Sequence, residues 1–64
     1  MGKLRRGGYV FFFWKGDHDP RHVHIFMDGR EVAKWNLDSW VLMKGEMNKK
    51  LLKILEELVR EGKL

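Results

Sequence analysis

Three histidines stand close together in GDHDPRHVHIF, the stretch from Gly16 to Phe26. The imidazole ring is the side chain that titrates near neutral pH, and its neutral form is also a common metal ligand. His22 and His24 are two residues apart, so on a β-strand their rings project from the same face and can reach one centre. The stretch therefore indicates proton-transfer chemistry, a metal site, or a structural role beside a turn.

Acid–base catalysis on a phosphodiester is the first chemistry that this set fits. One imidazole can act as general base and the other as general acid, while a lysine and an arginine stabilise the charge that develops on the phosphoryl oxygens. RNA supplies its own 2′-hydroxyl as the nucleophile, so we expect no cofactor and no metal ion. The predicted catalytic residues are His18, His22, His24 and Lys34. The predicted substrate-binding residues are Asp17, Arg21, Arg30, Lys49 and Lys50.

Two alternatives use the same histidines differently. In one, neutral His18, His22 and His24 bind a divalent ion of the zinc or nickel type, although Lys34 and Arg21 would repel a cation. In the other, His18 and His22 hydrogen-bond to backbone carbonyls around the neighbouring proline, and His24 fills a half-buried position. Spacing alone leaves catalysis, metal binding and a structural role open.

Length, charge and cysteine content set bounds on the class of protein. A chain of 64 residues makes one domain, and 13 Lys and Arg against 9 Asp and Glu give a formal net charge of +4. This excess favours anionic partners such as RNA, DNA or an acidic protein, and it also contributes to solubility. The absence of cysteine fits a reducing compartment. No apolar run approaches the roughly 20 residues of a membrane span, and the N-terminus lacks the h-region of a signal peptide, so we expect a cytoplasmic protein without membrane contact.

The elements that position the histidines are predicted to form a three-stranded antiparallel sheet over residues 9–37. The aromatic run at 9–14 predicts a strand covered on both faces, preceded by a Gly7-Gly8 hinge and a flexible or partly ordered segment at 1–8. Residues 22–27 alternate polar with apolar side chains, Asp28-Gly29 turns the chain, and residues 30–37 return as the third strand.

The turn at Asp28-Gly29 decides which side chains face the histidines. A two-residue loop would pair Met27 with Arg30 and set both histidines on the apolar face of the next strand. A three-residue loop over 27–29 separates polar from apolar side chains, so burial favours it. This register pairs Phe26 with Arg30, His24 with Val32 and His22 with Lys34. It places Val23, Ile25, Ala33, Trp35 and Leu37 on the core face, and His22, His24, Phe26, Arg30, Val32, Lys34 and Asn36 on the opposite face.

The C-terminal part of the chain predicts an amphipathic helix over residues 48–61. Asn48 suits the N-cap and Gly62 the position after the last turn, and residues 38–45 form a connector with a short strand at 40–43. The apolar stripe consists of Leu51, Leu52, Ile54, Leu55, Leu58 and Val59. Because this stripe needs an apolar partner, we predict an α+β fold over residues 1–64, a small antiparallel sheet of three or four strands with one C-terminal helix packed across one face.

The histidine stretch also resembles a known family. Residues 17–25, DHDPRHVHI, are similar to Asp-His-x-Pro-x-His-Val-His-Val, the hallmark of small bacterial proteins grouped as domain of unknown function number 4160. The likeness covers roughly Tyr9 to Gly62. Such proteins look like the toxin partner of two-gene bacterial toxin–antitoxin modules, so the resemblance implies an antitoxin protein as partner. The residues that match the family's pattern are Asp17, His18, Pro20, His22, His24 and Lys34.

Together these observations favour a small cytoplasmic, toxin-like module that acts on RNA as a metal-independent ribonuclease. His22 and His24 are the predicted proton-transfer pair, and Lys34 with Arg21 the phosphate clamp. The first alternative is a binding module without catalysis, whose basic helix start and N-terminal Lys3, Arg5 and Arg6 hold a nucleic acid or an acidic antitoxin. The second is a histidine–metal protein. A homodimer that covers a sheet edge is compatible with all three.

Overall fold

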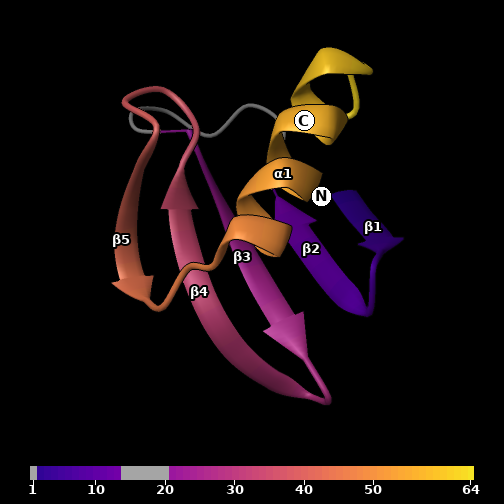
Figure 1. The fold of residues 1–64 in the computed structure, drawn as a ribbon, viewed down its shortest axis with the longest axis vertical. Coiled ribbons are helices and arrows are strands. Elements are labelled where there is room, and N and C mark those ends of the chain that lie inside the picture. Colours follow the sequence, from indigo (N-terminus) through magenta and orange to yellow (C-terminus); the bar gives the residue numbers. More distant parts are fainter. Residues whose placement is uncertain (1, 14–20) are drawn as a thin grey trace.

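Five strands and one helix make up the protein, in a computed structural model that describes residues 2–13 and 21–64. In chain order they are β1 (Gly2–Arg6), β2 (Tyr9–Phe13), β3 (His22–Met27), β4 (Arg30–Asn36), β5 (Val41–Gly45) and α1 (Lys49–Arg60). The strands form one antiparallel sheet in the order β1-β2-β3-β4-β5, and α1 lies across one face of it (Figure 1). The predicted α+β class is confirmed, with five strands in place of three or four.

The core lies between α1 and the sheet face that it covers. Alternate residues of β2, β3 and β4 point toward the helix, because successive side chains of a strand project to opposite faces. The buried side chains, each 7% exposed or less, are Tyr9, Phe11, Val23, Ile25, Ala33 and Trp35 from the sheet and Leu51, Ile54, Leu55 and Leu58 from the helix. The residues between them on each strand belong to the other face, which no helix of the described residues covers.

Both ends of α1 are capped as the sequence predicts. The Asn48 side chain accepts a hydrogen bond of 2.7 Å from the backbone N–H of Leu51. At the other end Gly62 has a φ of 76°, and the N–H of Lys63 donates to the carbonyl of Leu58 at 2.9 Å. This is the Schellman arrangement, in which a left-handed residue satisfies carbonyls of the last turn.

The N-terminal residues form an ordered edge strand, where the sequence predicts a flexible or partly ordered segment. Arg6 pairs with Tyr9 across Gly7 and Gly8, whose φ angles of 62° and 86° suit a type I′ turn. Leu4 faces Phe11 and packs against the core. The glycine pair is therefore a hairpin turn rather than a hinge.

Within the described part of the chain, strand β2 is covered on only one face, although the sequence predicts cover on both. Tyr9 and Phe11 are buried beneath the helix, whereas Val10 and Phe12 are partly exposed on the opposite face. The predicted strand also includes Trp14, which lies outside the described residues.

The second edge of the sheet is β5, which begins one residue later than predicted and extends to Gly45. Trp40 precedes it with a φ of 60°, a left-handed conformation that is uncommon for a residue with a large side chain. Its ring packs edge-to-face on that of Trp35, with centroids 5.3 Å apart. The contact turns Trp40 toward the core and away from the uncovered face.

The β3–β4 hairpin differs from its prediction at the turn. Met27 pairs with Arg30 across a two-residue turn. Asp28 and Gly29 have φ angles of 53° and 78°, and a type I′ turn requires positive φ at both central positions. The predicted three-residue loop, with Phe26 opposite Arg30, is therefore wrong.

A β-bulge at Val32 restores the face assignment that the longer loop was meant to provide. Phe26 pairs with Glu31 but Ile25 pairs with Ala33, so Val32 is the extra residue of β4 and packs against the core. The bulge keeps the apolar side chains of β3 and β4 on the helix side. Together with the two-residue turn, the bulge changes the predicted partners of the histidines, since His22 pairs with Asn36 and His24 with Lys34. The turn moves Arg30 and Val32 off the histidine face, because it pairs Arg30 with Met27.

Candidate functional site

The rings of His22 and His24 lie side by side on the uncovered face of the sheet. Their centroids are 5.1 Å apart and their planes are inclined at 75°. Both residues are partly exposed, and no polar or charged side chain is buried in the described part of the chain. The two imidazoles therefore share one solvent-accessible surface, as the two-residue spacing predicts.

His24 contacts a carboxylate that sequence analysis did not select. Its Nδ1 atom lies 2.5 Å from Oε2 of Glu31, and the two side chains are 24% and 28% exposed. A carboxylate in this position fixes the orientation of the imidazole. Glu31 comes close to His24 because the two-residue turn places it opposite Phe26, which follows His24 on the same face of β3.

One register row crosses the whole sheet through His24. From β1 to β5 the paired residues are Lys3, Phe12, His24, Lys34 and Lys44. Directly opposite residues of antiparallel strands share a face, and strands lie about 4.8 Å apart, so the row is roughly 19 Å long. It sets two lysines on one side of His24, and an aromatic ring and a third lysine on the other. We call it the cationic row.

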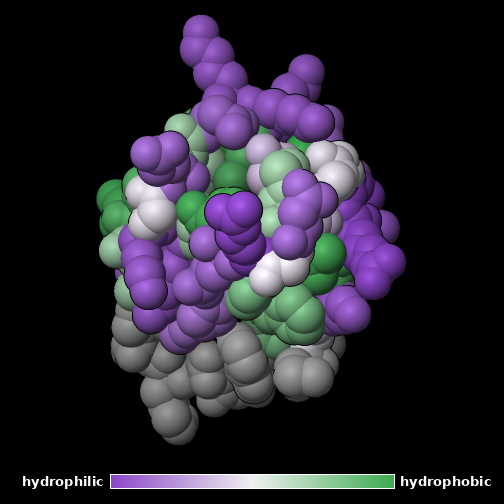
Figure 2. Space-filling model, turned by 90° about the horizontal axis from the view of Figure 1, so that it is seen from below, coloured by the Kyte–Doolittle hydropathy of each residue, from purple (hydrophilic) through white to green (hydrophobic). Residues whose placement is uncertain are grey.

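Beside the cationic row the face is aromatic. The rings of Phe12 and Phe26 pack edge-to-face with centroids 5.2 Å apart, and Nζ of Lys3 lies 5.5 Å from the centre of the Phe12 ring. Figure 2 looks onto the end of the molecule that carries the β1–β2 and β3–β4 turns, and hydrophobic surface emerges there between hydrophilic side chains. The uncovered face combines positive charge with exposed rings.

Lys49 and Lys50, predicted to bind substrate, do not join the histidines. They stand at the start of α1, on the other side of the sheet. Nζ of Lys50 lies 5.9 Å from the centre of the Tyr9 ring, which belongs to the core. The sheet separates both lysines from the imidazoles.

The two predicted substrate-binding arginines lie at opposite ends of the hairpin. Arg21 precedes β3 and is held by Asp38, whose carboxylate accepts a 3.0 Å hydrogen bond from the Arg21 backbone N–H and lies 3.8 Å from its guanidinium. Arg30 is exposed beside the β3–β4 turn, opposite Met27. Of the cations that the sequence selects, only Lys34 is paired with a histidine.

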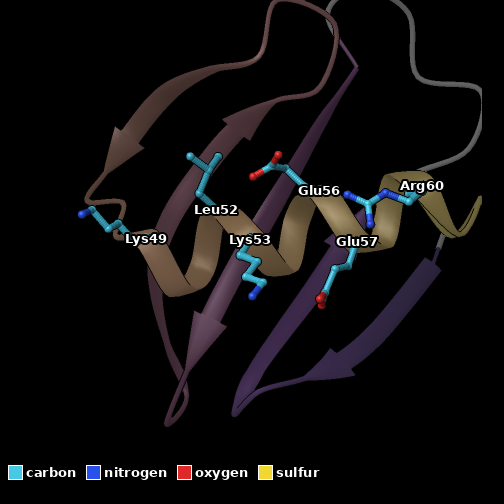
Figure 3. Close-up of a pocket in the computed structure, with 6 residues that line it drawn as sticks. All are labelled: Lys49, Leu52, Lys53, Glu56, Glu57 and Arg60. Carbon is cyan, nitrogen blue, oxygen red and sulfur yellow. The ribbon is translucent and has the colours of Figure 1, made fainter.

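A shallow hollow of about 430 Å³ runs along the outer side of α1. Figure 3 shows the side chains that line it along the helix. They carry both charges: Lys49, Leu52, Lys53, Glu56, Glu57 and Arg60. Because three basic and two acidic side chains share it, this surface carries little net charge and does not compete with the sheet face as a candidate site.

Two predicted site residues, Asp17 and His18, lie outside the described residues. The prediction of a metal site at His18, His22 and His24 extends into the same segment. Within residues 2–13 and 21–64, no three His, Cys, Asp or Glu side chains are grouped so that they could hold a metal ion.

The sequence contained signals for the residues that were missed. Asp28-Gly29 is the dipeptide most typical of a two-residue hairpin, and that turn places Glu31 beside the histidine strand. Gly7-Gly8 before an aromatic strand is the same kind of signal, and it pairs Lys3 with Phe12. Both dipeptides indicated the correct turn length, but neither shows where a bulge falls.

The fold and this face define a small α+β domain with a basic, aromatic sheet surface around a histidine pair. The chain belongs to the family described as "Domain of unknown function (DUF4160)", whose model matches residues 8–63. No curated protein and no solved structure matches the chain. In the described ranges, no helix has the length and apolar character needed to cross a membrane.

Proposed function

We propose that the uncovered face of the sheet binds RNA and cleaves it without a metal ion, using His22 and His24 as the proton-transfer pair. The observation that carries the proposal is the position of His24, between an imidazole, a carboxylate and a lysine. General acid–base catalysis requires two such groups on one accessible surface with a cation close by.

In the proposed reaction, His24 removes the proton of the ribose 2′-hydroxyl, and the 2′-oxygen attacks the adjacent phosphorus. His22 protonates the departing 5′-oxygen, so the products are a 2′,3′-cyclic phosphate and a 5′-hydroxyl. Glu31 stabilises the imidazolium that forms on His24, and Lys34 stabilises the charge on the non-bridging oxygens. The assignment of base and acid follows from the carboxylate: when Nδ1–H of His24 donates to Glu31, the Nε2 atom is left as the basic nitrogen.

A second candidate function is RNA binding without cleavage. The cationic row and the exposed rings of Phe12 and Phe26 support it, because aromatic stacking and phosphate contacts suffice to hold single strands. This function would use the same face and the same lysines, with the imidazoles as hydrogen-bonding groups rather than proton carriers.

For the cellular setting, we propose that the chain is the toxin-like member of a bacterial toxin–antitoxin pair and acts on cytoplasmic RNA. The support is the likeness of residues 17–25 to the pattern described above. An antitoxin protein would then be a partner, and co-expression of this antitoxin should relieve the growth arrest that the chain causes.

The test compares the wild type with the double variant His22→Ala, His24→Ala. We expect induction of the wild type to arrest growth and fragment total RNA, and the purified protein to leave cyclic phosphate ends in the presence of a chelator. The double variant should fold, as checked by circular dichroism, and should lose cleavage. Lys53→Ala, which removes one positive charge from the outer side of α1, is the control and should cleave like the wild type.

Three results would count against this function. Cleavage by a folded double variant would show that the histidines take no part in the reaction. Cleavage that stops with the chelator and returns with zinc would favour the metal interpretation. RNA binding that weakens steeply with salt, with no product at any protein concentration, would favour the second candidate.

A further inference from the structure

A shallow hollow of about 440 Å³ on the uncovered face lies beside the histidines and has no role in the proposed proton transfers. It is formed by β1, β2, β3 and the β3–β4 turn. Its lining consists of Lys3, Arg5, Val10, Phe12, Phe26 and Gly29. The floor is apolar and aromatic, and one rim carries two cations.

The aromatic floor is accessible rather than packed away. Phe12 and Phe26 are partly exposed and meet edge-to-face, and Nζ of Lys3 lies 5.5 Å from the centre of the Phe12 ring. Lys3 and Arg5 are exposed, and both stand on the edge strand β1. A flat, electron-rich group with an attached anion matches this combination, since the ring stacks and the anion meets the two cations.

The hollow is continuous with the histidine site through the register of the sheet. Phe12 pairs with His24 on one side and with Lys3 on the other. A base stacked on Phe12 would therefore lie one strand spacing, about 4.8 Å, from the imidazole of His24. The phosphate next to that base is then within reach of His24 and Lys34.

We propose that this hollow is a base-stacking subsite that selects single-stranded RNA and directs one unpaired nucleotide to His24. The subsite rests on the proposed function and names its substrate class. A duplex keeps its bases stacked on one another, so it offers no free ring to Phe12 and Phe26, whereas an unpaired strand does. The strand runs across the sheet, along the cationic row, with its phosphates on Lys3, Lys34 and Lys44.

Binding is measured apart from cleavage with a short, fluorescein-labelled, fully 2′-O-methylated single strand, which lacks the hydroxyl nucleophile. Fluorescence anisotropy should show that Phe26→Leu weakens binding by roughly 5- to 150-fold, the range expected for one stacked base. Phe13→Leu removes an aromatic ring from the helix side of β2 and is the matched control, with binding close to wild type. The same strand annealed to its complement should bind more weakly than the free strand.

A second variant covers the case in which Phe26→Leu does not fold. Phe26→Trp keeps an aromatic ring, and its emission should be quenched when the methylated strand binds. Unchanged affinity in a folded Phe26→Leu variant, equal affinity for the duplex, or unquenched Trp emission would overturn the subsite. Binding of an acidic aromatic peptide in place of the single strand would identify the hollow as a protein-docking surface and overturn it equally. Because the probe cannot be cleaved, the binding measurement tests the subsite whether or not the protein is a ribonuclease.

Discussion

At the scale of single residues, His24 has two neighbours of opposite charge. Glu31 contacts its Nδ1 atom at 2.5 Å, and Lys34 is its cross-strand partner on β4. A carboxylate holds an imidazole in one orientation, and a lysine on the neighbouring strand favours anions near that ring. Under the proposed function, Glu31 is therefore a positioning residue that acts through His24, rather than a group that touches the substrate.

We expect Glu31→Gln to lower cleavage by up to about 10²-fold without unfolding the protein, because general acid–base catalysis contributes roughly 10²–10⁴-fold and part of it depends on the orientation of the base. Nitrogen-15 NMR should also show an altered tautomer balance at His24, which a purely structural role would not produce. Glu56→Gln, on the exposed side of α1, is the control. An unchanged His24 spectrum would contradict the assignment.

The orientation of the two histidines could be predicted from the sequence, whereas their partners could not. A spacing of two residues and the apolar Val23 and Ile25 suffice to set both rings on one face. The partners depend on the turn and the bulge, which shift every pair without altering the alternation along β3. Glu31 was missed for that reason.

At the scale of elements, the β3–β4 hairpin combines a short turn with a β-bulge that corrects its register. The sequence favours a two-residue turn at Asp28-Gly29, and burial favours the apolar side chains of β4 on the helix side. The hairpin satisfies both requirements by means of one extra residue, Val32, which lies in β4 instead of in the turn. The helix was predictable in detail because Asn48 and Gly62 mark its ends locally, whereas β1 has only one apolar side chain, Leu4, to indicate a strand.

Gly45, the last residue of β5, provides a test of how closely β4 and β5 approach. Its φ is 85°, and a Cβ added there would lie 2.2 Å from the backbone oxygen of Val32. We expect Gly45→Ala to destabilise the protein by about 2–5 kcal/mol, combining left-handed strain of about 1–2 kcal/mol with overlap of about 1–3 kcal/mol.

The matched control for this prediction is Gly29→Ala, where φ is 78° and nothing lies within 4 Å of the added Cβ. That substitution should show the conformational term alone. Urea denaturation of both variants gives the comparison. If both variants lose the same free energy of unfolding, β4 moves to accommodate the added Cβ, and the close contact at Val32 is not rigid.

At the scale of the whole molecule, an ion pair fastens the first strand to the end of the helix. The guanidinium of Arg6 donates two hydrogen bonds, of 2.8 and 2.9 Å, to the carboxylate of Glu61. These bonds lower the pKa of the Glu61 carboxyl and raise that of the Arg6 guanidinium. The pair joins residues 55 positions apart in the chain.

This pair makes stability depend on pH in the acid range. Because the pKa of Glu61 is lower in the folded state than its ordinary value of 4.5, the pair contributes stability above about pH 4.5 and loses it as the pH falls through the lowered value. We expect Glu61→Gln to melt at a lower temperature than wild type at pH 7, with the difference shrinking in strong acid. Thermal melts across this range check it, with Glu56→Gln as control. A difference that stays constant with pH would contradict the ion pair's contribution.

The cationic row begins and ends on the two outermost strands, with Lys3 on β1 and Lys44 on β5. The edge strands of a sheet open before its central strands. The two outer lysine contacts to an anionic strand would therefore be lost while the central strands are still folded. Affinity should therefore decline ahead of global melting as acid or heat loosens the borders. In this protein, the affinity for a ligand would therefore show whether the two edge strands are still paired with the rest of the sheet.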